Sequence, residues 1–278
     1  MDARTDSYPL KEATAPRTGI GSGENLPMCG ICGIVSFEEE PGVAVVEAMA
    51  LSLKHRGPDA GGICSFASCV LGHRRLSILD LSDSANQPML SADGLTALVF
   101  NGEIYNFMEL RTDLESRGHR FRTNSDTEVL LELYLEDGEA MLEKLNGMFG
   151  LAVWDEREQR LFLARDRVGK KPLYYCWRGG RLSFSSELLS LVQDEKTPRE
   201  VSEQAAFEFF LYDFIPGTHT IFEGVRKLPP ASAAVFDRRG LRIRTYWEPP
   251  EPDDSLSYAA QTARLEELLT DAVRIRLV

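Results

Sequence analysis

The sequence lacks a long apolar run. Nowhere does it contain the roughly 18 consecutive apolar residues that a membrane-spanning helix needs. Its first 27 residues include prolines and closely spaced glycines, but no apolar segment of the kind that secretion signals carry. We therefore expect no membrane partner and a cytoplasmic protein.

Basic charge is also scarce. The chain has 31 Lys and Arg residues against 43 Asp and Glu residues, a formal net charge of -12. Proteins that bind nucleic acids or anionic membrane surfaces carry clustered basic residues. The balance predicts no nucleic-acid partner and favours small metabolites or proteins.

Cysteines are few, and their number is odd: positions 29, 32, 64, 69 and 176. Without an export signal, reduced thiols are the default. The pairs Cys29-x-x-Cys32 and Cys64-x4-Cys69 could close a tetrahedral zinc site. Cys32 and Cys69, however, lie in apolar, strand-like surroundings that are typical of buried structural cysteines. We expect no metal site.

Short β-rich runs broken by turn residues fill much of the remaining chain, several of them spaced as antiparallel hairpins. They cover residues 31–37, 62–70, 95–100, 149–154, 161–164, 173–177, 182–185, 233–236 and 241–246. Helical patterns occur at 43–54, 107–117, 127–136 and 203–212, and Gly118 follows the second as a stop signal. The alternation predicts an α+β fold of sheets flanked by helices.

The C-terminal part has a different pattern. Three prolines and four acidic residues at 248–254 predict a linker, which we place at 248–256. An amphipathic helix follows at roughly 257–276, with Leu265, Leu268, Leu269 and Val273 on one face. A lone helix cannot bury its own apolar stripe. It either packs back on the main domain or has its partner outside this chain.

Cys29 is the candidate nucleophile. It directly follows Met28 and enters an apolar run, so removal of the preceding residues would leave its thiol beside a free α-amine. An α-amine with a pKa of roughly 8 can take the thiol proton at neutral pH, whereas a peptide nitrogen cannot. This chemistry requires translation from Met28 or removal of a leader.

A thiol that hydrolyses the side-chain amide of glutamine needs an arginine for the carboxylate, an acid for the ammonium group and donors for the oxyanion. Arg56 precedes a Gly-Pro turn that could aim it inward, although a solvated loop arginine is the alternative. Asn101 and Gly102 could donate to an oxyanion, yet Asn-Gly between strand-like runs is also a common hairpin turn.

Two acidic residues are candidates for the ammonium contact. Glu103 follows Gly102 and could equally be a polar strand residue. Asp126 lies in a capping box formed by Ser125 and Glu128, which leaves its carboxylate free near a helix start. The basic segment 164–172 is interpreted as a solvated loop without a catalytic role.

Taken in order, eleven short motifs resemble the glutaminase domain of class II glutamine amidotransferases, and most closely the glutamine-hydrolysing asparagine synthetases. They lie at residues 28–31, 55–59, 71–78, 87–89, 101–106, 125–128, 147–149, 164–167, 171–175, 220–225 and 227–230. The resemblance covers essentially residues 28 to 278.

The resemblance implies an N-terminal-nucleophile hydrolase fold, a four-layer αββα sandwich of two antiparallel sheets between helices. It also implies roles for single residues. Cys29 would be the nucleophile with its α-amine as base, and Asn101 and Gly102 the oxyanion hole. Arg56, Asn101, Gly102, Glu103 and Asp126 would contact glutamine.

It further implies a division of the chain. Residues 29–247 would form the glutaminase domain, 1–28 a leader or mis-assigned start that is disordered or removed, and 257–278 the first helix of an absent synthetase domain. ATP and Mg are implied for that domain, with no cofactor in this segment. Glutamine is the expected substrate, a synthetase domain or subunit is the expected partner, and a homodimer is left open.

Two alternatives to this function stay open: a catalytically silent regulatory or binding module, or an amidotransferase subunit that serves a different ammonia acceptor.

Overall fold

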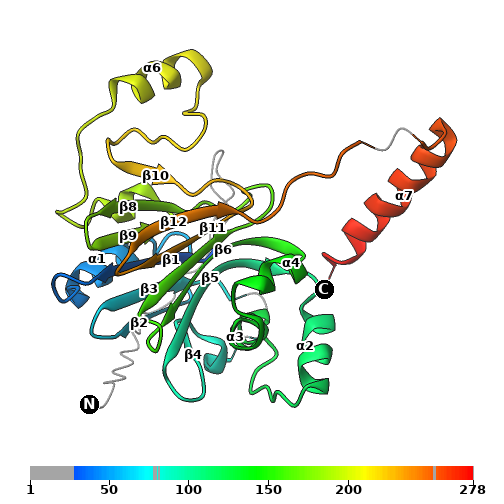
Figure 1. The fold of residues 1–278 in the computed structure, drawn as a ribbon, viewed down its shortest axis with the longest axis horizontal. Coiled ribbons are helices and arrows are strands. Elements are labelled where there is room, and N and C mark those ends of the chain that lie inside the picture. Colours follow the sequence, from blue (N-terminus) through cyan, green and yellow to red (C-terminus); the bar gives the residue numbers. More distant parts are fainter. Residues whose placement is uncertain (1–27, 78–79, 81, 253–254, 278) are drawn as a thin grey trace, which may run out of the picture.

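The computed structural model describes residues 28–77, 80, 82–252 and 255–277. The predictions for residues 1–27, for 253–254 within the linker and for residue 278 lie outside these described residues. The described chain forms two six-stranded antiparallel sheets with helices on their outer faces (Figure 1). The predicted α+β class and its αββα layering are confirmed.

The first sheet contains β1, the strand that follows the candidate nucleophile. Its order is β10 (Val225–Lys227), β8 (Tyr174–Arg178), β9 (Arg181–Ser185), β1 (Gly30–Ser36), β3 (Cys69–Arg75) and β2 (Ala60–Ser65). The second sheet has the order β12 (Gly240–Thr245), β11 (Ser232–Asp237), β7 (Arg160–Arg165), β6 (Gly147–Asp155), β5 (Thr96–Ile104) and β4 (Met89–Leu90).

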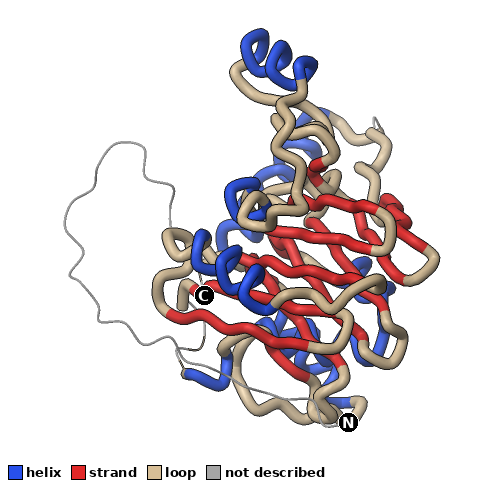
Figure 2. The backbone as a smooth tube through the Cα atoms, turned by 90° about the vertical axis from the view of Figure 1, so that its left-hand side faces the viewer, coloured by secondary structure: helices blue, strands red, loops and turns tan. Residues whose placement is uncertain are grey.

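Apolar side chains from both sheets form the central core. Ile31 and Phe184 from the first sheet meet Val99 and Trp154 from the second, and all four are fully buried. Side chains alternate between the two faces of a strand, so the intervening residues point outward, where apolar ones such as Ile34 and Leu98 pack against helices. Figure 2, turned by 90°, shows the strands stacked between these helices.

Helices cover the two outer faces. α1 (Val43–Ser52) and α5 (Leu188–Leu191) pack on the first sheet, while α2 (Phe107–Ser116), α3 (Asp126–Asp137) and α4 (Met141–Lys144) pack on the second. Two short 3-10 helices lie at Asp83–Ala85 and Gly138–Ala140. Gly118, predicted to stop α2, has a φ of 98° directly after the helix C-cap, a conformation that favours glycine.

One strand prediction is wrong. Residues 62–70 were expected to form a single strand, but the chain reverses after Ser65 and β3 begins at Cys69. The turn contains no Gly or Pro to mark it. β3 ends in Gly-His-Arg-Arg, a polar run that gives no strand signal, yet all seven residues of the strand are buried because β1 and β2 flank it.

Two helices keep large apolar surfaces exposed. α6 (Glu203–Tyr212) and the loop after it stand above the sheets in Figure 1, with the Phe210 side chain 86% exposed. α7 (Tyr258–Arg274) confirms the predicted C-terminal helix, but its apolar stripe does not pack back on the domain: Leu265, Leu268, Leu269 and Val273 are each more than half exposed. None of the described helices is both long and apolar enough to cross a membrane.

Candidate active site

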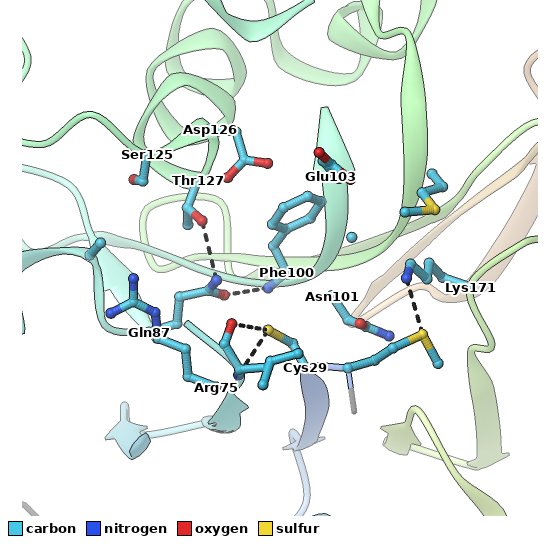
Figure 3. A pocket seen from close by; sticks show the side chains of 15 residues that line it. Cys29, Arg75, Gln87, Phe100, Asn101, Glu103, Ser125, Asp126, Thr127 and Lys171 are labelled. Atoms are coloured by element: carbon cyan, nitrogen blue, oxygen red, sulfur yellow. Dashed lines mark hydrogen bonds between the residues drawn. The ribbon is translucent and has the colours of Figure 1, made fainter. Parts of the chain in front are cut away.

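A cavity of about 90 Å³ lies where the start of β1 meets the open edge of β5 (Figure 3). Both acidic candidates, the candidate nucleophile and the Asn-Gly pair line it. The lining residues are Met28, Cys29, Arg75, Leu76, Ala85, Gln87, Phe100, Asn101, Gly102, Glu103, Ser125, Asp126, Thr127, Met148 and Lys171. The structure therefore brings together four of the five predicted glutamine contacts and Cys29.

Cys29 lies directly before β1 with its thiol in the cavity. The Leu76 N–H donates to Sγ at 3.4 Å, and the Leu76 carbonyl lies 3.7 Å from the same sulfur. Burial raises the pKa of the Cys29 thiol, while the Leu76 hydrogen bond and the Arg75 charge oppose that rise. A thiol in this setting needs a base to become a nucleophile.

Asn101 and Gly102 do not form a turn. They lie inside β5, opposite Gly150 and Phe149 of β6, so the hairpin interpretation is wrong. Pairing with β6 continues along β5 from Thr96 to Ile104 and keeps both residues extended, so the turn signal of Asn-Gly yields to that tertiary pairing.

The open edge of β5 orients the Gly102 N–H. The N–H groups of Phe100 and Ile104 donate across this edge, to Gln87 Oε1 at 2.6 Å and to Asp126 Oδ2 at 3.1 Å. Backbone groups of alternate residues along a strand point to the same edge. The N–H of Gly102, which lies between the two, therefore points toward the cavity as well.

Steric fit and an unused donor single out the same pair. A Cβ at Gly102 would lie 2.1 Å from the Met148 carbonyl oxygen, so a side chain cannot be placed there without moving β6. Asn101 is 1% exposed, and its Nδ2 has no hydrogen-bond partner among the described residues. A buried, unpaired donor beside a thiol is the arrangement that an oxyanion would satisfy.

Asp126 is the first residue of α3 and is 5% exposed. Burial, reinforced by the nearby Glu103 carboxylate, raises the pKa of Asp126 to about 6, although the Ile104 N–H opposes that rise. The predicted capping box is half formed: Ser125 Oγ accepts from the Glu128 N–H at 3.3 Å, but the Glu128 carboxylate accepts from other backbone groups.

Arg56 does not line the cavity. Its Nε donates to the Cys29 carbonyl at 3.0 Å and its Nη1 to Glu187 at 3.0 Å. The residue is 8% exposed, so the solvated-loop interpretation is wrong. Its position also does not support the predicted glutamine contact, because the guanidinium is held behind the Cys29 backbone rather than within the cavity.

Arg75 occupies the place in the cavity that was expected for Arg56. Its Nη1 donates to the Ser82 carbonyl at 3.0 Å and to Asn86 Oδ1 at 2.8 Å, which fixes the guanidinium at the cavity wall (Figure 3). Sequence reasoning missed this residue, although it lies in one of the matched motifs, 71–78. Arg75 directly follows His73 and Arg74, and nothing in the local sequence shows which of these three side chains lines a cavity.

Gln87 is a second missed residue. Its Oε1 accepts from the Phe100 N–H, and its Nε2 donates to Thr127 Oγ1 at 3.2 Å. It thereby links the open edge of β5 to the first turn of α3. This link positions the acidic residue at the start of the helix relative to the Asn-Gly pair.

The basic segment 164–172 is not a solvated loop throughout. Arg165 donates from three nitrogens to the carbonyls of Lys171, Leu228 and Gly169, each at 2.7 Å. Lys171 is 7% exposed and lines the cavity, with its Nζ 3.1 Å from Met28 Sδ. Lys170, by contrast, is exposed.

The described residues contain no group of three or more His, Cys, Asp or Glu side chains placed to hold a metal ion. Cys32 and Cys69 are fully buried in the apolar layers on either side of the first sheet. Burial raises the pKa of both thiols. They behave as small apolar core residues.

A family model described as a glutamine amidotransferase domain matches residues 28–247. The chain belongs to this family. It is 36% identical over 258 residues to asparagine synthetase (glutamine-hydrolyzing) 3 of Bacillus subtilis, covering 90% of this chain and 42% of that protein. It is 41% identical over 170 residues to asparagine synthetase (glutamine-hydrolyzing) of Asparagus officinalis, covering 60% and 28%. The chain thus spans less than half the length of these relatives.

Two solved structures share the fold. The glutamine phosphoribosylpyrophosphate amidotransferase of Bacillus subtilis superimposes with a TM-score of 0.59 at 20% identity, over 80% of this chain and 50% of that one. An allosteric regulatory enzyme of purine biosynthesis gives a TM-score of 0.61 at 20% identity, with the same coverage. At this identity the likeness concerns the fold alone.

Proposed function

We propose that this chain hydrolyses the side-chain amide of glutamine to glutamate and ammonia through a thioester on Cys29. The observation that carries the proposal is one cavity lined by both Cys29 and Asn101, whose buried Nδ2 has no partner among the described residues. Membership of the amidotransferase family supports the choice of glutamine.

In the proposed reaction, the Cys29 α-amine, once it is free, takes the proton from Sγ, and the thiolate attacks the side-chain carbonyl carbon. Asn101 Nδ2 and the Gly102 N–H donate to the resulting oxyanion. The protonated amine then gives its proton to the leaving nitrogen, which departs as ammonia. Water, deprotonated by the same amine, cleaves the thioester to release glutamate and restore the thiol.

The polar groups at the other end of the cavity would bind the amino-acid end of glutamine. We assign the α-carboxylate to Arg75, because its guanidinium lines the cavity while that of Arg56 does not. The α-ammonium group is assigned to Glu103 and Asp126. A charged ammonium beside Asp126 would also favour the ionised carboxylate, whose pKa is raised in the structure described.

We further propose that the ammonia passes to an ATP-dependent synthetase unit that makes asparagine from aspartate, in line with the names of the relatives. That unit would be a further domain or a separate subunit, and it would hold the ATP and Mg. The exposed α7 stripe fits the earlier expectation of a partner outside this chain.

The test is glutamate release from glutamine by protein that begins at Cys29, with protein that begins at Met1 assayed in parallel. We expect turnover from the Cys29 form alone, because the Met1 form has a peptide nitrogen where the base is needed. Cys29→Ala in the Cys29-started form serves as the inactive control. Equal turnover by both forms, or none by a folded Cys29 form, would contradict the proposal.

A further inference from the structure

Lys171 is a buried cation in the cavity that the proposed reaction does not use. It follows the loop after β7 and reaches the cavity on the Asn101 side (Figure 3). Its Nζ donates to Met28 Sδ at 3.1 Å, and it forms no ion pair with any of the described carboxylates. A thioether is a weak acceptor, so this contact offsets little of the cost of burying an ammonium group.

The surrounding charges are mixed. Burial lowers the pKa of Lys171, and the Arg56 charge adds to this effect, whereas Cys29, Glu103 and Asp166 oppose it and favour the ammonium form. Arg75 and Asp126, on β3 and α3, complete the charged groups that line the cavity. Lys171 thus lies near two acidic residues, Glu103 on β5 and Asp166 in its own loop, and near the nucleophile Cys29, which directly precedes β1.

Removal of Met28 changes what Lys171 faces. The methionine sulfur that accepts the Lys171 hydrogen bond is lost with Met28. Cys29, which follows Met28 in the chain, then carries a free α-amine. Two cations would then compete for one small cavity, and a neighbouring positive charge disfavours protonation of an amine. The amine can accept the thiol proton only when it is unprotonated.

We propose, resting on the glutaminase function above, that Lys171 is a positioning residue whose ammonium group keeps the freed α-amine of Cys29 unprotonated near neutral pH. The same charge stabilises the thiolate once the proton has moved to the amine. In the chain that still carries Met28, Lys171 binds the methionine side chain over the site instead.

The test uses Cys29-started protein with Lys171→Met, which removes the charge at similar length, and Lys171→Arg, which keeps it. Lys170→Met is the matched control, since the neighbouring Lys170 is exposed. Two pH profiles are measured: kcat/KM for glutamate release, and the rate of Cys29 alkylation by iodoacetamide, read by peptide mass spectrometry.

In Lys171→Met we expect the midpoint of the acid limb to rise by about one pH unit in both profiles. Both kcat/KM and the alkylation rate should therefore be roughly ten-fold lower than in wild type at low pH and equal to wild type at high pH. Lys171→Arg and Lys170→Met should keep the wild-type midpoint. A loss by the same factor at every pH, or an unchanged midpoint, overturns the inference. If Lys171→Met does not fold, Lys171→Gln takes its place.

The alkylation profile separates this inference from the proposed function. It needs no glutamine turnover, so it reports the effect of Lys171 on the amine and thiol even if wild-type protein releases no glutamate. Absence of glutamate release from the wild type would sink the glutaminase proposal, whereas a midpoint independent of Lys171 would sink only the inference.

Discussion

Arg56 Nε donates to the backbone carbonyl of Cys29 at 3.0 Å, and Glu187 accepts from Nη1 of the same guanidinium at 3.0 Å. The arginine therefore fixes the backbone of the residue that carries the thiol. Arg75 lines the cavity, and we have assigned the glutamine carboxylate to it in the proposed reaction. Kinetics can separate these two functions.

Arg56→Met should lower kcat by about ten- to a hundred-fold with little change in KM, because it frees the Cys29 backbone without removing a substrate contact. Arg75→Lys should instead raise KM by about ten-fold, since a lysine cannot form the bidentate contact of a guanidinium with a carboxylate. Steady-state glutamate release at varied glutamine concentration measures both. A raised KM with normal kcat in Arg56→Met would restore the sequence-based assignment.

Asn101→Leu should reduce kcat by about a hundred- to a thousand-fold, the usual effect of losing one oxyanion donor. The same change should leave the folded state as stable as wild type, because Nδ2 is buried without a described partner and leucine removes that unsatisfied group. Glutamate release and urea unfolding are measured on the same samples. Loss of activity together with a large loss of stability would mean that Asn101 is structural.

Asp126→Asn should stabilise the folded protein at pH 8 by about 1–3 kcal/mol while weakening glutamine binding. The pKa of Asp126 is raised to about 6 in the fold, so the folded state holds this proton more tightly than the unfolded state. Wild-type stability therefore falls, relative to the variant, as pH rises from about 4 to 6.

Urea unfolding at pH 4, 5, 6 and 8 tests this sign. The difference between the two proteins should be small at pH 4 and reach a plateau above pH 7. A variant that is less stable than wild type at pH 8 would show that the ionised carboxylate contributes favourably through its Ile104 hydrogen bond. Asp113→Asn, a change on the exposed surface of α2, controls for general effects of charge.

Cys29→Ala should abolish glutamate release, whereas Cys32→Ser should retain it at a cost in stability of about 1–3 kcal/mol. The Cys32 thiol is fully buried beside α1, with the Val46 carbonyl 3.9 Å away. Activity assays and thermal melting distinguish the two variants. Equal loss of activity in both would indicate a paired function of the two cysteines.

The strand and helix patterns and the α+β class follow from apolar periodicity, which is a local property of the sequence. The αββα layering was implied by the family resemblance that the ordered motifs carry. The motifs also identified site candidates that the fold gathers around one cavity: Cys29, Asn101, Gly102, Glu103 and Asp126. The leader and the role of the C-terminal segment stay predictions.

Tertiary structure alone decided which arginine lines the cavity. It also placed Asn101 inside a strand, where the local sequence favoured a turn. Arg56 and Arg75 carry the same charge in similar polar runs. The pairing of β3 with β1 places Arg75 beside the thiol. The loop after α1 instead places Arg56 against the backbone carbonyl of Cys29. The burial of Lys171 likewise cannot be deduced from the basic segment that contains it, because this burial depends on strands that are distant in sequence. Local sequence determines which groups are present, and long-range packing determines which of them face one another.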